Sequence, residues 1–296
     1  MTESQLQKHA DYWQCRFSAM ASPCEVLVET DDRTQAEELL HIVMTEAHRI
    51  EQKFSRYRSD NIVYQINSNR GNPINVDPET AQLLNFAQQL FELSDGLFDI
   101  TSGVLREAWH FDGSDHVPDP EKIALLLNRV GWDKVSWTGE SLTMLDKMQI
   151  DFGGIGKEYA VDRAVLLIKQ HSPLPCLVNF GGDLAITETR KNDKVWQIGI
   201  ESVNQLNKSS EHVLELKRGA LATSGDVRRF LLKDGVRYGH ILNPKTGWPI
   251  QNAPRSVTVA AGTCTEAGML STLGMLQGKS CESFLTEEKI QFWCMR

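Results

Sequence analysis

The chain has 296 residues, of which 41% are hydrophobic and 24% are charged, a composition typical of a soluble enzyme with a large core. Its 39 acidic and 31 basic residues give a formal charge of −8, which argues against a nucleic-acid-binding surface. The N-terminal stretch lacks the apolar region of a secretory signal, and no segment has the roughly 20 apolar residues of a membrane span, so we expect a cytoplasmic protein.

The first third of the chain is predicted to contain a polar tail, a strand and two helices. Residues 1–16 form the expected tail, and residues 24–29 alternate between polar and apolar like a strand. Residues 33–54 carry apolar side chains at spacings of three and four, which predicts an amphipathic helix. A second helix is expected to start near Pro78, whose fixed φ suits a first turn, and to end near Asp95.

The middle of the chain is less regular. Residues from about 102 to 139 are rich in Asp, Gly, Pro and Trp and predict an irregular excursion with a short helix at 122–130, which would suit a lid. Further strands are expected at 148–151, 176–180, 196–200, 212–216 and 256–261, and further helices at 158–170 and 264–277. This mixture predicts an α/β or α+β fold, with residues 17–296 as a single domain.

Six cysteines are scattered through the chain without a C-x-x-C pair. The spacing therefore predicts neither a zinc site nor a redox dithiol. Buried free thiols are the expectation.

The segment DFGGIGKEYAVD at residues 151–162 combines an acid, three closely spaced glycines and a lysine. Glycines allow positive φ and let a ligand approach the backbone, while exposed N–H groups, a helix start and Lys157 supply positive charge. This combination suits a diphosphate. The spacing matches neither G-x-G-x-x-G nor the Walker pattern, so an ordinary turn between a strand and a helix is the alternative.

Three further segments pair glycine with charged or hydrogen-bonding side chains. They are NFGGDL at 179–184, ATSGDVRRF at 222–230 and YGHILNPKTGWPI at 238–250. Each follows or ends an apolar run, as expected where a strand leaves a sheet, and loops at such places often bind ligands. A tight turn explains any one of them, but four such segments in one chain favour a shared binding site.

These segments recur with other motifs in a recognisable order. The other motifs are MASPCEV at 20–26, FSRYRSDNIVYQIN at 54–67, LFDIT at 97–101 and EAGMLST at 266–272. Taken together, the sequence from about residue 17 to residue 278 resembles the ApbE family of FAD:protein FMN transferases.

The resemblance implies a fold, an activity and partners. The fold would be a two-lobed α/β scaffold related to the pterin-binding T-fold proteins. The enzyme would bind FAD and a divalent metal, usually Mg²⁺, and transfer FMN to a threonine hydroxyl of an acceptor protein, with AMP leaving. An intracellular acceptor is expected, because no lipoprotein signal precedes Cys15 or Cys24.

The resemblance also implies individual site residues. His240 is the candidate general base or phosphate ligand, and Lys157, with the glycine amides, would neutralise phosphate charge. The metal ligands would be the Gly154 carbonyl and Thr272. The expected cofactor contacts are Met20, Tyr57, Leu97, Phe98, Asp99, Asp151, Lys157, Ser224, Arg229, His240 and Ile241.

Several of these residues have a structural alternative. Met20 and Phe98 have side chains that core packing alone would explain. His240, between a glycine and an isoleucine, could be a satisfied structural group. Asp183 follows a glycine pair and could simply cap a turn.

Three positions depart from the family pattern. Gly268 stands where the family motif E-A-D-x-L-x-T has its metal-binding aspartate, Glu158 follows Lys157 where glycine is usual, and Asn243 stands where aspartate is common. Loss of an anionic ligand predicts weaker Mg²⁺ binding, unless Glu266 or Glu158 assists the site. Restoring the acid with Gly268→Asp is expected to tighten metal binding.

The departures leave two alternatives to the transferase. With water in place of threonine, the protein would be an FAD pyrophosphatase that yields FMN and AMP. Without turnover, it would be an FAD-binding protein, an interpretation motivated by the missing acid at Gly268 and by Asn243.

Overall fold

The computed structural model describes residues 4–69, 71–201, 210–226 and 229–296. Within these ranges the largest sheet has eight strands, each antiparallel to its neighbours, in the order β1-β2-β3-β7-β8-β11-β14-β15. Its strands are β1 (Gln5–Lys8), β2 (Trp13–Ala19), β3 (Ser22–Val28), β7 (Cys176–Phe180), β8 (Asp183–Ile186), β11 (Ala220–Gly225), β14 (Ser256–Ala261) and β15 (Gln291–Met295).

The N-terminal segment corrects the first prediction, because the expected tail at residues 1–16 includes strand β1 and the start of β2. In β2 the side chains of Cys15, Phe17 and Ala19 are buried, while Arg16 and Ser18 between them are exposed. The polar residues that suggested a tail are therefore the outward half of an alternating strand.

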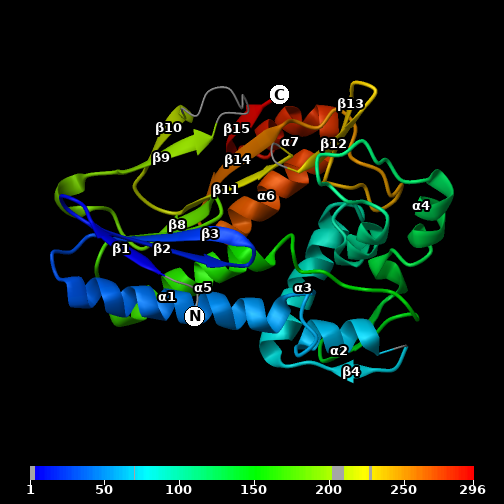
Figure 1. Ribbon diagram of the computed structural model, residues 1–296, viewed down its shortest axis with the longest axis horizontal. Helices are drawn as coiled ribbons and strands as arrows, with labels where there is room; N and C mark the ends of the chain where they lie inside the picture. Colours follow the sequence, from blue (N-terminus) through cyan, green and yellow to red (C-terminus); the bar gives the residue numbers. More distant parts are fainter. Residues whose placement is uncertain (1–3, 70, 202–209, 227–228) are drawn as a thin grey trace.

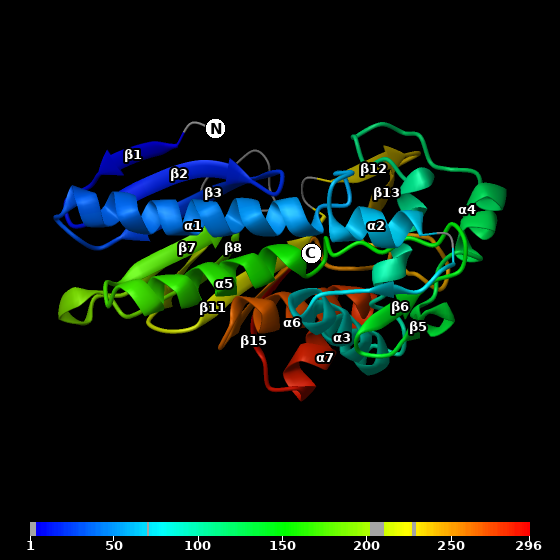
Figure 2. The ribbon, with the colours of Figure 1, turned by 90° about the horizontal axis from the view of Figure 1, so that it is seen from below.

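Three long helices cover one face of this sheet (Figures 1 and 2). They are α1 (Arg33–Phe54), α5 (Gly156–His171) and α6 (Cys264–Leu276), and the short α7 (Cys281–Glu287) follows α6. Helix α1 begins where the Asp32 carboxylate accepts hydrogen bonds from the backbone N–H groups of Thr34 and Gln35. The four long helices expected from the sequence, these three and α3 (Pro78–Leu93), are confirmed to within about two residues.

The other face of the sheet carries a hairpin of β9 (Trp196–Glu201) and β10 (Ser210–Leu216). Alternation along β7 explains how both faces are covered. Val178 belongs to the main core under the helices, whereas its neighbour Leu177 packs with Trp196 and Leu216 under the hairpin.

The remaining elements form a second lobe, on the right of Figure 1. Its helices are α2 (Ile62–Ser68), α3 and α4 (Pro120–Leu127), with 3₁₀ turns η1 (Ile100–Glu107) and η2 (Trp132–Lys134). Its strands are β4 (Ile74–Asn75), β5 (Ser136–Trp137), β6 (Ser141–Thr143), β12 (Phe230–Lys233) and β13 (Val236–Gly239). Two more 3₁₀ turns, η3 (Lys191–Asp193) and η4 (Gly278–Ser280), lie outside this lobe. The main apolar core includes Val26 of the sheet and Leu84 of α3, so the lobes share it.

The expected irregular excursion at 102–139 is more ordered than its composition suggested. Its apolar residues Leu105, Trp109 and Ile123 form a separate buried cluster with Leu231 of β12. The indole N–H of Trp109 donates to the carbonyl of Gly247 at 2.8 Å, which fastens the 238–250 segment to this lobe.

The prediction of a strand at 148–151 was wrong. The Asn67 side chain bonds both backbone groups of Ile150, with its amide donating to the carbonyl at 3.0 Å and its oxygen accepting from the N–H at 2.7 Å. A side chain thus takes the place of a strand neighbour. Among the described helices, none has the length and apolar character that crossing a membrane requires.

Candidate functional site

The first part of the site lies before α5, where the predicted glycine segment forms a turn. The Asp151 carboxylate accepts from the Gly153 N–H at 2.8 Å and faces Arg56 Nη1 at 3.4 Å and Arg106 Nη2 at 3.7 Å. Asp151 and Arg56 are largely buried, whereas the Arg106 side chain is 45% exposed. Arg106 is therefore the cation of this group that a ligand can reach.

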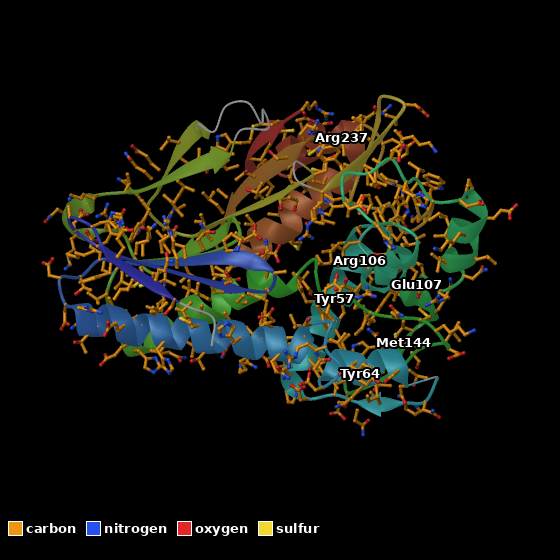
Figure 3. The ribbon with its side chains drawn as sticks, in the orientation of Figure 1. Tyr57, Tyr64, Arg106, Glu107, Met144 and Arg237 are labelled. Carbon is orange, nitrogen blue, oxygen red and sulfur yellow. The ribbon has the colours of Figure 1, made fainter. Side chains whose placement is uncertain are left out.

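Tyr57 belongs to the same group. Its hydroxyl accepts a hydrogen bond from Arg106, and the two side chains lie side by side between the lobes in Figure 3. Tyr57 is 77% exposed, so it offers a free aromatic face beside an arginine. Such a face suits the stacking of a flavin or adenine ring. Arg56 and Arg106 were missed from the sequence, although Arg56 stands beside Tyr57 in a quoted motif.

The second part of the site surrounds the start of α5. Ile155 precedes the helix and gives its first turn no side-chain cap. The Gly156 N–H donates to the Phe152 carbonyl at 2.7 Å, so the Lys157 N–H is the first α5 amide without an acceptor among the described residues. The Gly154 turn packs against Phe98, whose ring would lie 3.3 Å from a Cβ at that position. A glycine turn leading into an uncapped helix start favours an anion.

Lys157 forms an ion pair with Asp183, which is 2% exposed and also accepts from the Thr223 N–H at 3.0 Å. Burial lowers the pKa of Lys157, but the negative charges of Asp183 and Glu158 outweigh burial, and the net pKa is raised. Asp183 therefore does more than cap its turn. The positive charge expected from Lys157 is half of a pair inside the protein.

The β2–β3 and β7–β8 turns meet beside this pair. Met20, in the β2–β3 turn, has a φ of 53°. A Cβ on Gly181 of the β7–β8 turn would lie 2.9 Å from Ser22 and 3.8 Å from Lys157. Gly181 has a φ of +65°, so glycine is required there for both conformation and space. The β2–β3 turn, which carries Met20, thus approaches Lys157 through Ser22 and Gly181.

A group of hydroxyls lies between β11 and α6. Ser224 Oγ is 2.9 Å from both Ser271 Oγ and Thr272 Oγ1, and Ser271 donates to the Gly268 carbonyl at 3.0 Å. These contacts bring two predicted residues, Ser224 and Thr272, together. Hydroxyl and carbonyl oxygens are donors that suit a hard cation such as Mg²⁺.

Glu158, on the first turn of α5, faces the same part of α6. A Cβ on Gly268 would lie 2.5 Å from Glu158 Cγ and 2.9 Å from its Oε1. The Oε2 atom of Glu158 has no hydrogen-bond partner in the part of the chain that the structure describes. Burial, followed by the nearby charge of Asp183, raises the pKa of Glu158 to about 8. This environment changes what we expect of Gly268→Asp, because the new side chain would collide with Glu158.

His240 lies in the third part of the site, after β13. Its Nδ1 is 3.3 Å from the Arg229 carbonyl, and its ring packs edge-on against Phe111 with centroids 6.3 Å apart. Burial lowers the pKa of His240 to about 4, and the positive charge of Arg229 acts in the same direction. The charges of Asp226 and Arg106 also act on this imidazole, so it shares an electrostatic environment with the Asp151 group.

The remaining predicted residues are held mainly by contacts within the protein. The Asp99 carboxylate accepts from Thr101 at 2.6 and 2.7 Å and from the Trp132 N–H at 3.0 Å, so its oxygens are already engaged. Leu97 and Ile241 pack against the main core. The side chain of Arg229 is exposed. Two residues of the predicted 222–230 segment, 227 and 228, lie outside the described residues.

Comparison with known proteins identifies the relatives of this chain. A model of the ApbE family matches residues 20–293. An FAD:protein FMN transferase of Vibrio cholerae is 29% identical over 235 residues, which cover 78% of this chain and 70% of that protein. Another, from Haemophilus influenzae, is 31% identical over 231 residues, which cover 74% of this chain and 67% of that protein.

Solved structures agree with these matches. The ApbE protein of Thermotoga maritima has a TM-score of 0.84 and 32% identity, over 96% of this chain and 94% of that one. The flavin transferase ApbE of Vibrio cholerae has a TM-score of 0.81 and 25% identity, over 99% of this chain and 94% of that one.

Proposed function

Because the chain belongs to the ApbE family, we propose that it is an FAD:protein FMN transferase. The threonine hydroxyl of an acceptor protein attacks the phosphorus on the FMN side of the FAD diphosphate. A phosphoester bond forms, the bond to the AMP phosphate breaks, AMP leaves and the hydroxyl proton passes to a base. Such a transfer depends on alignment and on neutralising phosphate charge more than on covalent help from the enzyme.

The observation that carries this proposal is the uncapped start of α5 beside a glycine turn, with the hydroxyls of Ser224 and Thr272 on neighbouring elements. The α5 amides would hold a phosphate, and the exposed Arg106 would add positive charge at the Asp151 end. The open face of Tyr57 would stack on a ring of FAD.

His240 is proposed as the base. The Arg229 carbonyl can only accept a hydrogen bond, so it fixes the proton of the neutral imidazole on Nδ1 and leaves the Nε2 lone pair free. A neutral ring in this tautomer accepts a proton at Nε2 and does not donate from that atom to a phosphate oxygen. Of the two roles expected from the sequence, this geometry favours the base.

The Thr272 hydroxyl and the Gly154 carbonyl are oxygen donors of the kind that a divalent cation binds, and Mg²⁺ is the proposed one. When bound, it would neutralise charge on the diphosphate. We also propose that the protein works in the cytoplasm, because its six cysteines are free thiols and five of them are buried, which suits a reducing compartment.

The test is to incubate the protein with FAD, Mg²⁺ and an acceptor that the Vibrio cholerae relative modifies. The expected result is an acceptor mass increase of one FMN less one water, with one AMP released per acceptor. An acceptor with alanine in place of the threonine serves as the control. Free FMN with unmodified acceptor would instead identify a pyrophosphatase, and tight FAD binding without products would identify a binding protein.

A further inference from the structure

Glu158 carries a buried carboxylate that forms no ion pair with a cation among the described residues, although the charge of the neighbouring Lys157 acts on it. The residue is 9% exposed, and its Oε2 has no hydrogen-bond partner there. The neighbouring Lys157 is engaged with Asp183. A buried carboxylate costs free energy unless it is paired, protonated or bound to a metal, so a cation beside Glu158 would stabilise its ionised form.

The register of α5 against α6 directs Glu158 to the side of α6 that carries Thr272. Asp162 accepts hydrogen bonds at 2.8 Å from the first N–H groups of α6, at Cys264 and Thr265. Glu158 lies one turn before Asp162 on α5, and it contacts Gly268, which lies one turn after Cys264 on α6. The helices are therefore antiparallel, and the turn of α6 after Gly268 brings Thr272 to the same end.

Gly268 is the residue that makes room for this carboxylate. A Cβ at that position would lie 2.5 Å from Glu158 Cγ and 2.9 Å from Oε1, closer than real Cβ atoms approach other atoms. Any side chain at 268 would displace the Glu158 side chain from this position, so the carboxylate of Glu158 occupies this place only because residue 268 is glycine. The two departures from the family pattern are an acid gained at 158 and an acid lost at 268. Because the two positions are in contact, both departures affect the same place in the structure.

We propose that Glu158 supplies the anionic oxygen of the divalent-cation site, in place of the aspartate that the family pattern has at position 268. The inference rests on the proposed function for the identity of the site. The site then keeps its negative charge, but the carboxylate that carries the charge belongs to α5 instead of α6. With Thr272 and the Gly154 carbonyl, Glu158 gives a set of oxygen donors that suits Mg²⁺ or Mn²⁺.

The test measures Mn²⁺ binding directly, by electron paramagnetic resonance, with and without FAD. Glu158→Gln keeps the shape of the side chain and removes its charge, and it is expected to weaken Mn²⁺ binding at least about tenfold. FAD binding in EDTA, followed by flavin fluorescence, should stay unchanged, which separates loss of the cation from loss of the fold.

The matched control is Glu266→Gln, which removes an acid from the first turn of α6. The Glu266 carboxylate accepts a hydrogen bond at 3.1 Å from the N–H of Gly262, which lies just before the start of α6, so this acid already has a partner. Mn²⁺ affinity of this variant should therefore stay close to that of the wild-type chain. A tenfold loss in both glutamine variants would show a general effect of acidic charge and would overturn the assignment to Glu158.

A relocated acid provides the second variant. The double change Glu158→Gly with Gly268→Asp moves the carboxylate to α6 and is expected to restore Mn²⁺ binding to within a few-fold of wild type, whereas Gly268→Asp alone should not tighten it. Equal Mn²⁺ affinity of Glu158→Gln and the wild-type chain would overturn the inference, as would no Mn²⁺ binding by the wild-type chain in either condition. Neither result depends on transfer activity, so a failure of the proposed function would be seen separately, in the acceptor assay.

Discussion

Replacing Lys157 with methionine tests whether its ion pair with Asp183 stabilises the fold. The change keeps an unbranched apolar side chain but leaves the Asp183 carboxylate, which is 2% exposed, without its cation. Breaking a buried pair costs about 3–5 kcal/mol, and the remaining hydrogen bond from Thr223 offsets about 1 kcal/mol. We therefore expect the free energy of unfolding to fall by about 2–4 kcal/mol.

The assay is urea unfolding at pH 7, followed by circular dichroism. Lys245→Met is the matched control, because Lys245 pairs at 2.8 Å with Asp95, whose side chain is 98% exposed. Such a surface pair contributes less than about 1 kcal/mol. If both lysine variants lost the same small amount, the Lys157 pair would not be a stabilising contact and the reasoning would be refuted.

The pH dependence gives a second check on the same variant. The pKa of Lys157 is raised in the folded protein, so its contribution is complete below the unfolded value of about 10.4 and is lost as the pH rises through the folded value. The difference between wild type and Lys157→Met should therefore not shrink from about pH 7 to pH 9. It should widen as Glu158 ionises, because the charge of Lys157 lowers the pKa of that carboxyl, which is about 8 in the folded wild-type protein. A difference that shrank over this range would contradict the assigned direction of the shift.

Three other variants test the site and its supports. The wild-type chain should lose stability between pH 7 and pH 5, because His240 takes up a proton near pH 6.5 in the unfolded chain but only near its pKa of about 4 in the folded protein. The His240→Asn variant should reduce that loss by about 1–2 kcal/mol, measured by urea unfolding at both pH values. In Gly268→Ala the contact with Glu158 opposes a gain of about 1 kcal/mol in helix propensity, so the fold should lose at most about 2 kcal/mol, and adding Glu158→Gly should remove that contact in the same assay. Trp109→Phe should cost about 1–3 kcal/mol by leaving the Gly247 carbonyl unpaired, and an unchanged urea midpoint would argue against that bond.

The long helices could be predicted because their apolar stripes are local. In α1 the buried Ala36, Leu39, Val43, Ala47 and Ile50 recur at helical spacing, so the pattern alone defines the element. Strand β2 was missed since its outward residues are polar and make the segment resemble a tail. The segment at 148–151 failed for a related reason, because a distant asparagine binds its backbone and composition does not show this.

The glycine segments could be recognised from the sequence because glycine is required by local backbone geometry, as at Gly181 with its φ of +65°. The pairing of charges was not predictable in the same way. Arg106 and Asp151 are 45 residues apart, and Lys157 and Asp183 are 26 apart, so only the fold brings them together. A sequence pattern therefore predicts the glycine positions of a turn more readily than it predicts which charged residues form an ion pair.

The departures at 158 and 268 show the consequence for interpreting an altered motif. From the sequence, Gly268 suggested a weakened metal site, and Glu158 was one of two acids that could assist it. In space the two residues touch, and the volume that one side chain vacates is the volume that the other fills. A missing acid is evidence for lost metal binding only when no other carboxylate can reach the same place, and in this fold Glu158 lies against the vacated position.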